Sequence, residues 1–237
     1  MKRYLSVFEM IARSSFYKVL LILASMVVAE AVCFYLTMAH TAGLSIEEYI
    51  EQSKFCLFFE IAYILITIVI VLPGMNLGST QSYTLERLRI KGKRIFWLQS
   101  LYNFFAYILL WGIQLVVILV SIIVYQKHLP EGASVTNQTM FLAFYRSDFM
   151  HSILPLEDAP GWWVLGLIGV TTAFSAAEFT KLQRDGKFGF ELLLLVVSAL
   201  ITFPRALGYE ITFEVVAFCI VYMIMGMRWL LNVVGEE

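Results

Sequence analysis

Residues 97–125 read WLQSLYNFFAYILLWGIQLVVILVSIIVY and contain no acidic or basic side chain. A helix of this length can cross the hydrocarbon core of a bilayer, which takes about 20 apolar residues. Across the 237 residues, 60% are hydrophobic and 15% charged, with a mean hydropathy of +0.78. Soluble globular domains are far less apolar. The sequence therefore predicts an all-α integral membrane protein.

Five further stretches reach or approach the length and apolar character of a membrane span. With residues 97–125 they form a single predicted membrane domain over residues 1–237. The fifth stretch is short and runs into Phe203, Pro204 and Arg205. We therefore expect a re-entrant outer turn, and not an ordinary loop, between the fifth and sixth helices. The six expected spans are residues 19–39, 55–72, 97–125, 162–180, 188–203 and 211–234.

Residues 1–18 predict an amphipathic helix that lies in the membrane interface. A cleaved signal peptide is the alternative, because a basic start precedes an apolar run and Ala29-Glu30-Ala31 resembles a cleavage site. The apolar run continues past that site to Ala39, which favours the interfacial helix. The apolar face of the helix comprises Tyr4, Leu5, Phe8, Ile11, Ala12 and Phe16.

Lysine and arginine are distributed unevenly between the two sides of the predicted bundle. Thirteen of the 17 fall on the side that also holds both termini. Because cytoplasmic loops carry an excess of these residues, we expect both termini in the cytoplasm and the chain in the inner (plasma) membrane. The other four are Lys54, Lys127, Arg146 and Arg205.

The longest loop on the opposite side, residues 126–161, also has a helical pattern. Apolar residues recur in it at helical spacing until Pro155. We expect a helix there, lying along the outer membrane surface or covering the translocation path. The repeating residues are Met140, Phe141, Phe144, Tyr145, Phe149 and Ile153.

Residues 75–97, MNLGSTQSYTLERLRIKGKRIFW, form the long polar segment on the basic side. Turn and cap residues open the segment, helix formers follow, and Gly92 is suited to end a helix. We interpret it as a short helix that docks on a cytoplasmic partner. The alternative is an ordinary basic loop that obeys the positive-inside rule. The apolar side of the helix comprises Tyr83, Leu85, Leu88 and Ile90.

Three glutamates, Glu30, Glu60 and Glu214, lie inside predicted spans. A charged carboxylate at the bilayer centre costs about 2.5 to 3.5 kcal/mol on insertion scales, so such residues face a bundle interior, a cavity or a partner. One hypothesis is that they line a pathway open to the outer side, with Arg205 as counter-ion. The alternative is that each is protonated or hydrogen-bonded to a neighbouring helix for packing.

No catalytic motif is recognisable in the sequence. Neither Gly92-Lys93 nor Gly186-Lys187 belongs to a phosphate-binding loop, because no glycine stands five residues earlier and no Ser or Thr follows the lysine. The three histidines have no partner at metal-ligand spacing, and the three cysteines lie in or beside apolar segments. We expect no catalytic residues, no metal, no cofactor on this chain and no nucleic-acid partner.

The order of these elements resembles the membrane subunits of ABC-2 type transporters. That plan has an amphipathic N-terminal helix, six spans with both ends inside, a cytoplasmic coupling helix after the second span and a re-entrant outer turn before the sixth. The amphipathic helix corresponds to residues 1–18, the coupling helix to residues 79–90 and the re-entrant turn to residues 203–210. The string YTLERL at residues 83–88 is similar to what such permeases carry in the coupling loop. The long loop at residues 126–161 departs from the plan.

The resemblance implies an ATP-driven exporter in which this chain forms half of the translocation pathway. A separate ATPase subunit would bind ATP and Mg and dock on the coupling helix, and a second copy or a sister permease would complete the pathway. The implied cargo is a peptide, drug or bacteriocin, for export or immunity. The coupling residues would be Tyr83, Leu85, Glu86, Arg87, Leu88 and Arg89.

Two other functions remain open from the sequence. The substrate-binding membrane component of a vitamin importer also has about six spans and uses a separate ATPase, but it would not need a basic helical loop after its second span. A membrane sensor or assembly protein that transports nothing would use the intramembrane glutamates for packing alone.

Overall fold

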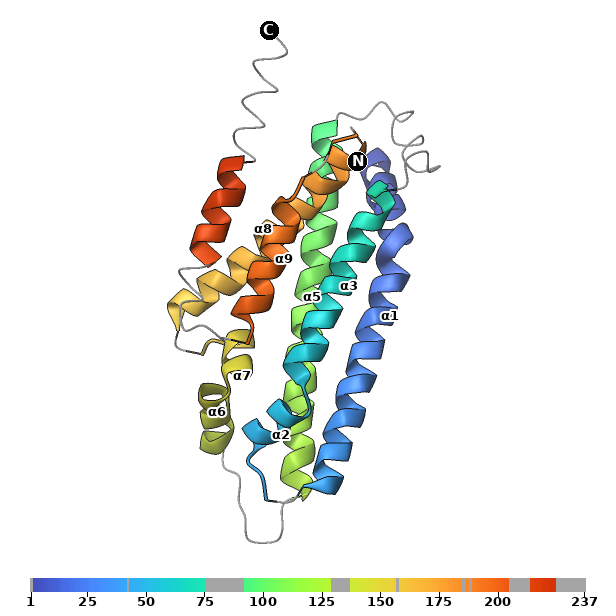
Figure 1. The fold of residues 1–237 in the computed structure, drawn as a ribbon. Coiled ribbons are helices and arrows are strands. Elements are labelled where there is room, and N and C mark those ends of the chain that lie inside the picture. The colour runs from blue at the N-terminus through green and yellow to red at the C-terminus, as the bar shows by residue number, and fades with distance from the viewer. Residues whose placement is uncertain are drawn as a thin grey trace.

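The structure is a computed structural model, and every regular element in its described part is an α-helix. The helices form an elongated bundle, with α1 (Lys2–His40) along one side (Figure 1). The structure describes residues 2–41, 43–75, 92–128, 137–156, 158–184, 186–187, 189–204 and 214–224.

Four helices are long and apolar enough to cross a membrane. Their apolar segments are Ile11–His40 in α1, Phe55–Leu72 in α3 (Phe55–Met75), Lys93–His128 in α5 (Gly92–His128) and Ala159–Gln183 in α8 (Ala159–Arg184). The prediction of an all-helical, multi-pass membrane protein is confirmed. The second segment matches the expected span at residues 55–72.

The fifth and sixth expected spans are shorter in the described residues. Helix α9 covers Glu191–Thr202, and a last apolar helix covers Glu214–Ile224. Twelve residues of helix extend about 18 Å, well short of the hydrocarbon thickness of about 30 Å. Six full spans are therefore not observed among the described residues, and the outer turn expected at residues 203–210 lies mainly outside them.

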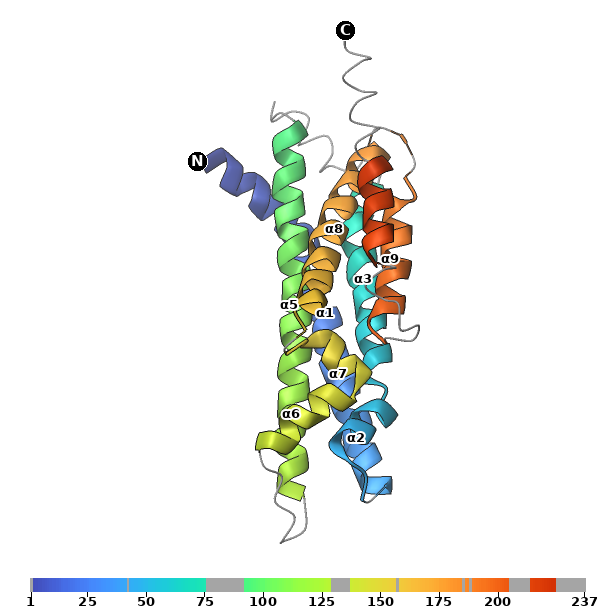
Figure 2. The same ribbon diagram turned by 90° about the vertical axis from the view of Figure 1, so that its left-hand side faces the viewer.

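The expected boundary between an interfacial helix at residues 1–18 and a first span at residues 19–39 is not a helix boundary. Helix α1 is continuous: no proline or glycine separates the amphipathic pattern from the apolar one, and the Ser14 hydroxyl donates to the Ile11 carbonyl within the helix at 2.7 Å. Its first turns, darkest blue in Figure 2, nevertheless lean away from the axis of the bundle. The same helix therefore provides both a leaning N-terminal part and a membrane-crossing part.

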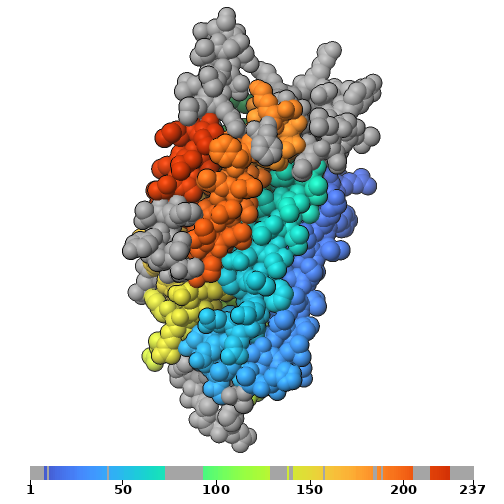
Figure 3. Space-filling model, in the orientation of Figure 1, coloured from blue at the N-terminus to red at the C-terminus, as the bar shows by residue number. Residues whose placement is uncertain are grey.

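The four long helices pack as a closed ring. Helix α1 contacts α3 and α5, and α8 closes the ring by contacting the same two helices. In chain order, α1, α3, α5 and α8 alternate in direction, so their connections alternate between the two ends of the bundle (Figure 1). Helix α9 packs on α8, and α1, α3 and α9 lie side by side on one face (Figure 3). Leu23, Ile66 and Leu110 are among the buried core residues.

Three short helices lie together at the end where α1 finishes: α2 (Ile46–Gln52), α6 (Asn137–Arg146) and α7 (Asp148–Ile153). The helix expected within residues 126–161 is thus observed as two pieces. Arg146 forms an exposed ion pair with Glu47 at 3.4 Å, and the Trp111 indole donates to the Ile153 carbonyl at 2.8 Å. These contacts join α6 to α2 and α7 to α5.

The close approach of α8 to its neighbours depends on small side chains. Helix α8 contacts α3, α5 and α9, and its Ala173, Ala176 and Ala177 are fully buried. The Asn103 side-chain amide on α5 donates to the Ala173 carbonyl at 3.2 Å. Small residues allow helix backbones in a membrane to approach closely, so this stretch of α8 is a packing seam within the chain.

Replacing Ala173 by leucine should lower the free energy of unfolding by about 1 to 3 kcal/mol, because extra methylene groups overpack a filled site. Thermal unfolding of purified protein in mild detergent measures the change. Gly166→Ala is the matched control on the same helix, because a Cβ atom there meets nothing within 4 Å. Equal loss of stability in both variants would contradict the seam.

Candidate functional site

Glu30 lies at the contact between α1 and α5, where it is completely buried. The side-chain amide of Gln114 on α5, also completely buried, donates to Glu30 Oε2 at 3.3 Å. The other carboxyl oxygen of Glu30 and the amide oxygen of Gln114 have no hydrogen-bond partner among the described residues. The pair therefore joins two membrane-crossing helices while leaving two buried acceptors unused.

The other two intramembrane glutamates have different partners. Glu214 is buried and forms a hydrogen bond with the Thr202 hydroxyl at 2.8 Å, which ties the last helix to the end of α9. Glu60 is partly buried on α3 and accepts from the Cys56 thiol, one turn away on the same helix, at 3.5 Å.

The structure does not show the three glutamates converging on one site. None of them lines either of the two cavities described below. The expected counter-ion, Arg205, lies outside the described residues. Their role in a transport pathway therefore stays a prediction.

A second polar cluster joins α3, α5 and α8. The Tyr63 hydroxyl donates to Thr172 Oγ1 at 2.9 Å, and the hydroxyls of Thr67 and Tyr107 lie 2.8 Å apart. Thr67 donates its only proton to the Tyr63 carbonyl at 2.8 Å, so Tyr107 is the donor to Thr67. All four side chains are buried, and every hydroxyl proton in the cluster has an acceptor.

Sequence reasoning did not single out this tyrosine and threonine cluster. Tyrosine and threonine are ordinary residues of apolar helices, and their spacing within one helix does not indicate which residue of another helix they meet. The available signal was the position of Tyr63 and Thr67 one turn apart inside a predicted span, which puts two polar groups on one helical face.

A cavity of about 220 Å³ lies beside this cluster between α3, α5 and α8. The hydroxyls of Tyr63 and Tyr107, which line it, are already engaged in hydrogen bonds. The cavity is therefore suited to a small apolar group and offers little to a charged one. Its aromatic lining consists of Phe59, Tyr63, Phe104, Tyr107, Trp111, Trp162 and Phe203.

The described residues contain no group of three metal-ligating side chains that could hold a metal ion. The expected coupling residues at 83–89 lie outside the described part of the chain. The helix ends that flank them, at Met75 and Gly92, lie at the same end of the bundle as the N-terminus (Figure 1).

No protein-family model, curated protein or solved structure matches the chain. The function is therefore inferred from the residues, their packing and the distribution of charge.

Removing Gln114 should destabilise the bundle, because Glu30 then loses its partner inside the membrane. We expect Gln114→Leu to lower the free energy of unfolding by about 1 to 3 kcal/mol. The double variant Glu30→Leu/Gln114→Leu should recover most of the loss, because replacing both partners by apolar groups can be nearly neutral. Unfolding of these two variants and of Glu30→Leu alone, measured in detergent, completes a double-mutant cycle, and additive losses would show that the two residues do not interact.

Proposed function

We propose that this chain is the membrane subunit of an ABC-2 type exporter in the plasma membrane. In this proposal it forms half of a translocation pathway and couples to a separate ATPase through the segment between α3 and α5. A second copy or a sister permease completes the pathway. The cargo is a peptide, drug or bacteriocin.

The proposal rests mainly on one observation: six exposed lysine and arginine side chains lie at one end of the bundle. Met75 and Gly92, the helix ends that flank the basic sequence of residues 76–91, lie at the same end (Figure 1). An excess of lysine and arginine is typical of the cytoplasmic side, where an ATPase would dock. The exposed cations at this end are Arg13, Lys18, Lys93, Arg94, Lys181 and Lys187.

The opposite end is richer in exposed carboxylates. Glu48, Glu51 and Asp148 are exposed there on α2 and α7, and they balance the exposed cations Lys54, Lys127 and Arg146 of the same end. This asymmetry supports an orientation with the N-terminus in the cytoplasm and α2, α6 and α7 on the outer side.

The short helices α9 and Glu214–Ile224 support the re-entrant element of the proposed plan. The two run in opposite directions (Figure 1), and the Thr202–Glu214 hydrogen bond joins the end of one to the start of the other. Both residues of that bond are buried. A hairpin anchored in this way fits a turn that lies against protein rather than lipid.

The contacts of α1 with α5 suggest how a push from the ATPase would reach the bundle. The Ser15 hydroxyl donates to the Tyr102 hydroxyl at 2.9 Å, and the rings of Phe8 and Tyr102 meet edge to face at 6.2 Å. A force applied to the start of α5 would therefore also move the leaning N-terminal part of α1. Buried polar contacts deeper in the bundle favour movement of the helices as a rigid group.

The closed packing of the four long helices supports a pathway shared with a second membrane subunit. The centre of the ring is filled by side chains such as Leu23, Ile66 and Leu110. Side chains packed at this density leave no channel through the centre of the ring. A route for cargo is then formed between two bundles rather than through one.

The proposal is tested by a pull-down of the tagged protein from native membranes in mild detergent, followed by mass spectrometry. We expect an ATPase with a phosphate-binding loop to accompany the wild type. Leu85→Asp and Leu88→Asp should abolish its recovery, because a charge on the apolar side of the coupling helix disrupts docking.

Ser82→Asp introduces the same charge at a polar position of the same segment and should leave recovery unchanged. All variants are first checked for membrane insertion and for a monodisperse elution profile. Absence of an ATPase from the intact wild-type protein, or equal recovery with the two leucine variants, would contradict the coupling role.

A further inference from the structure

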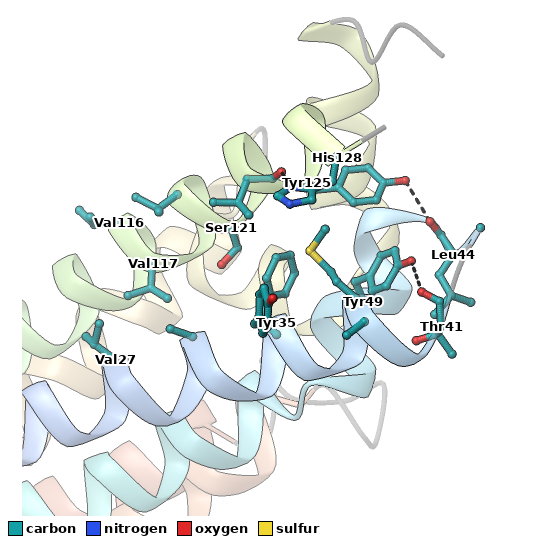
Figure 4. A pocket seen from close by; sticks show the side chains of 17 residues that line it. Val27, Tyr35, Thr41, Leu44, Tyr49, Val116, Val117, Ser121, Tyr125 and His128 are labelled. Atoms are coloured by element: carbon teal, nitrogen blue, oxygen red, sulfur yellow. Dashed lines mark hydrogen bonds between the residues drawn. The ribbon is translucent and has the colours of Figure 1, made fainter. Parts of the chain in front are cut away.

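A cavity of about 900 Å³ lies between α1 and α5, in the half of the bundle that ends at α2 and α6 (Figure 4). Its volume is within the range of small-molecule binding sites. Val27 and Ala31 on α1 and Val116, Val117 and Val120 on α5 line its deeper part. The cavity begins beside the Glu30–Gln114 contact and continues to the ends of both helices.

The mouth of the cavity is polar, unlike its walls. The Tyr49 hydroxyl donates to the Thr41 carbonyl at 2.7 Å, and the Tyr125 hydroxyl donates to the Leu44 carbonyl at 2.9 Å (Figure 4). His128 also lines this end and is exposed. The two tyrosine bonds hold the loop between α1 and α2 against α2 and α5, so the polar mouth has a defined shape.

The cavity matches one leaflet of a bilayer in depth. The wall on α1 runs from Val27 to Thr41, a rise of about 21 Å at 1.5 Å per residue. A bilayer with its headgroup regions is about 40 to 45 Å thick, so one leaflet is also about 21 Å deep. Valines line the end near the bilayer centre, and tyrosines and a histidine line the headgroup end.

The apolar walls of the cavity favour an apolar occupant. Tyr35, Val116 and Val120 are more than half exposed in this chain. Water does not fill an apolar cavity, and an empty gap loses the dispersion contacts of all the atoms that line it. An acyl chain of the surrounding leaflet has the shape and chemistry to restore those contacts.

Charge complementarity indicates the kind of headgroup. No carboxylate lines the cavity among the described residues, and the His128 imidazole lies at its headgroup end. Its Nδ1 lies 2.9 Å from the Val124 carbonyl, so that nitrogen carries a proton and Nε2 remains for another partner. The neighbouring Lys127 is exposed at the same end. The Lys127 ammonium and, in its protonated form, the His128 imidazole can bind a phosphate.

We propose that the cavity is a phospholipid site. One acyl chain lies between α1 and α5, and the phosphate lies at His128. The site is independent of the proposed exporter function, because it requires neither the ATPase nor a second membrane subunit.

The test uses the full chain in phosphatidylcholine vesicles that contain a small fraction of phosphatidylglycerol with a photoreactive diazirine on its acyl chain. After illumination, mass spectrometry maps the labelled peptides. We expect label to concentrate on residues 27–38 and 116–124. Ala31→Phe fills the cavity from α1 and should reduce labelling several-fold, and Val120→Phe, from the opposite wall, should do the same.

Val32→Phe is the matched control, because Val32 is exposed on the same helix but does not line the cavity. It should leave labelling unchanged, whereas His128→Ala should reduce labelling by this probe. Uniform labelling of all lipid-facing helices, or equal labelling of the filled and control variants, would overturn the proposal. Efficient disulfide-linked dimers of Ala31→Cys would also overturn it, because a second copy of the chain would then cover the cavity.

Discussion

The structure depends on one constraint: a buried polar side chain inside the membrane needs a hydrogen-bond partner from the protein itself. Six polar contacts meet this requirement between segments distant in sequence. They tie α1 and α8 to α5, α3 to α5 and α8, and the last helix to α9. Because each bond fixes the rotation of one helix against another, it selects one packing where apolar contacts alone would allow several. The six are Ser15–Tyr102, Glu30–Gln114, Tyr63–Thr172, Thr67–Tyr107, Asn103–Ala173 and Glu214–Thr202.

Most of the fold was predictable from the length and hydropathy of the apolar segments. The span at residues 55–72 was located correctly, and those at residues 97–125 and 162–180 lie within longer helices, because polar helix formers extend a helix beyond the hydrocarbon region. The amphipathic helix expected at residues 1–18 and the span expected at residues 19–39 belong to one continuous helix, α1, because no proline or glycine separates them. Hydropathy also could not reveal that the helix within residues 188–203 covers only Glu191–Thr202.

The polar contacts were only partly predictable. The cost of a carboxylate in lipid identified Glu30 and Glu214 as residues that need partners, but sequence spacing gives no information on contacts between helices. The sequence therefore could not show that Glu30 meets Gln114, that Glu214 meets Thr202 or that Tyr63 meets Thr172. The cavity between α1 and α5 was unpredictable for the same reason, because its two walls are about 90 residues apart in the chain. The distribution of lysine and arginine along the sequence predicted that one end of the bundle carries more basic residues than the other. This prediction requires no knowledge of contacts between helices.

The proposed coupling segment can meet an ATPase only if its end of the bundle faces the cytoplasm. The cavity mouth lies at the opposite end of the bundle and must then face the other side of the membrane. Single cysteines at exposed positions measure this orientation: Lys93→Cys and Lys127→Cys, in a background without Cys33, Cys56 and Cys219. The reagent is a membrane-impermeant maleimide applied to intact cells of a bacterial host. We predict that Lys127→Cys reacts directly and that Lys93→Cys reacts only after permeabilisation. The reverse pattern, or reaction of both from the same side, would contradict the account.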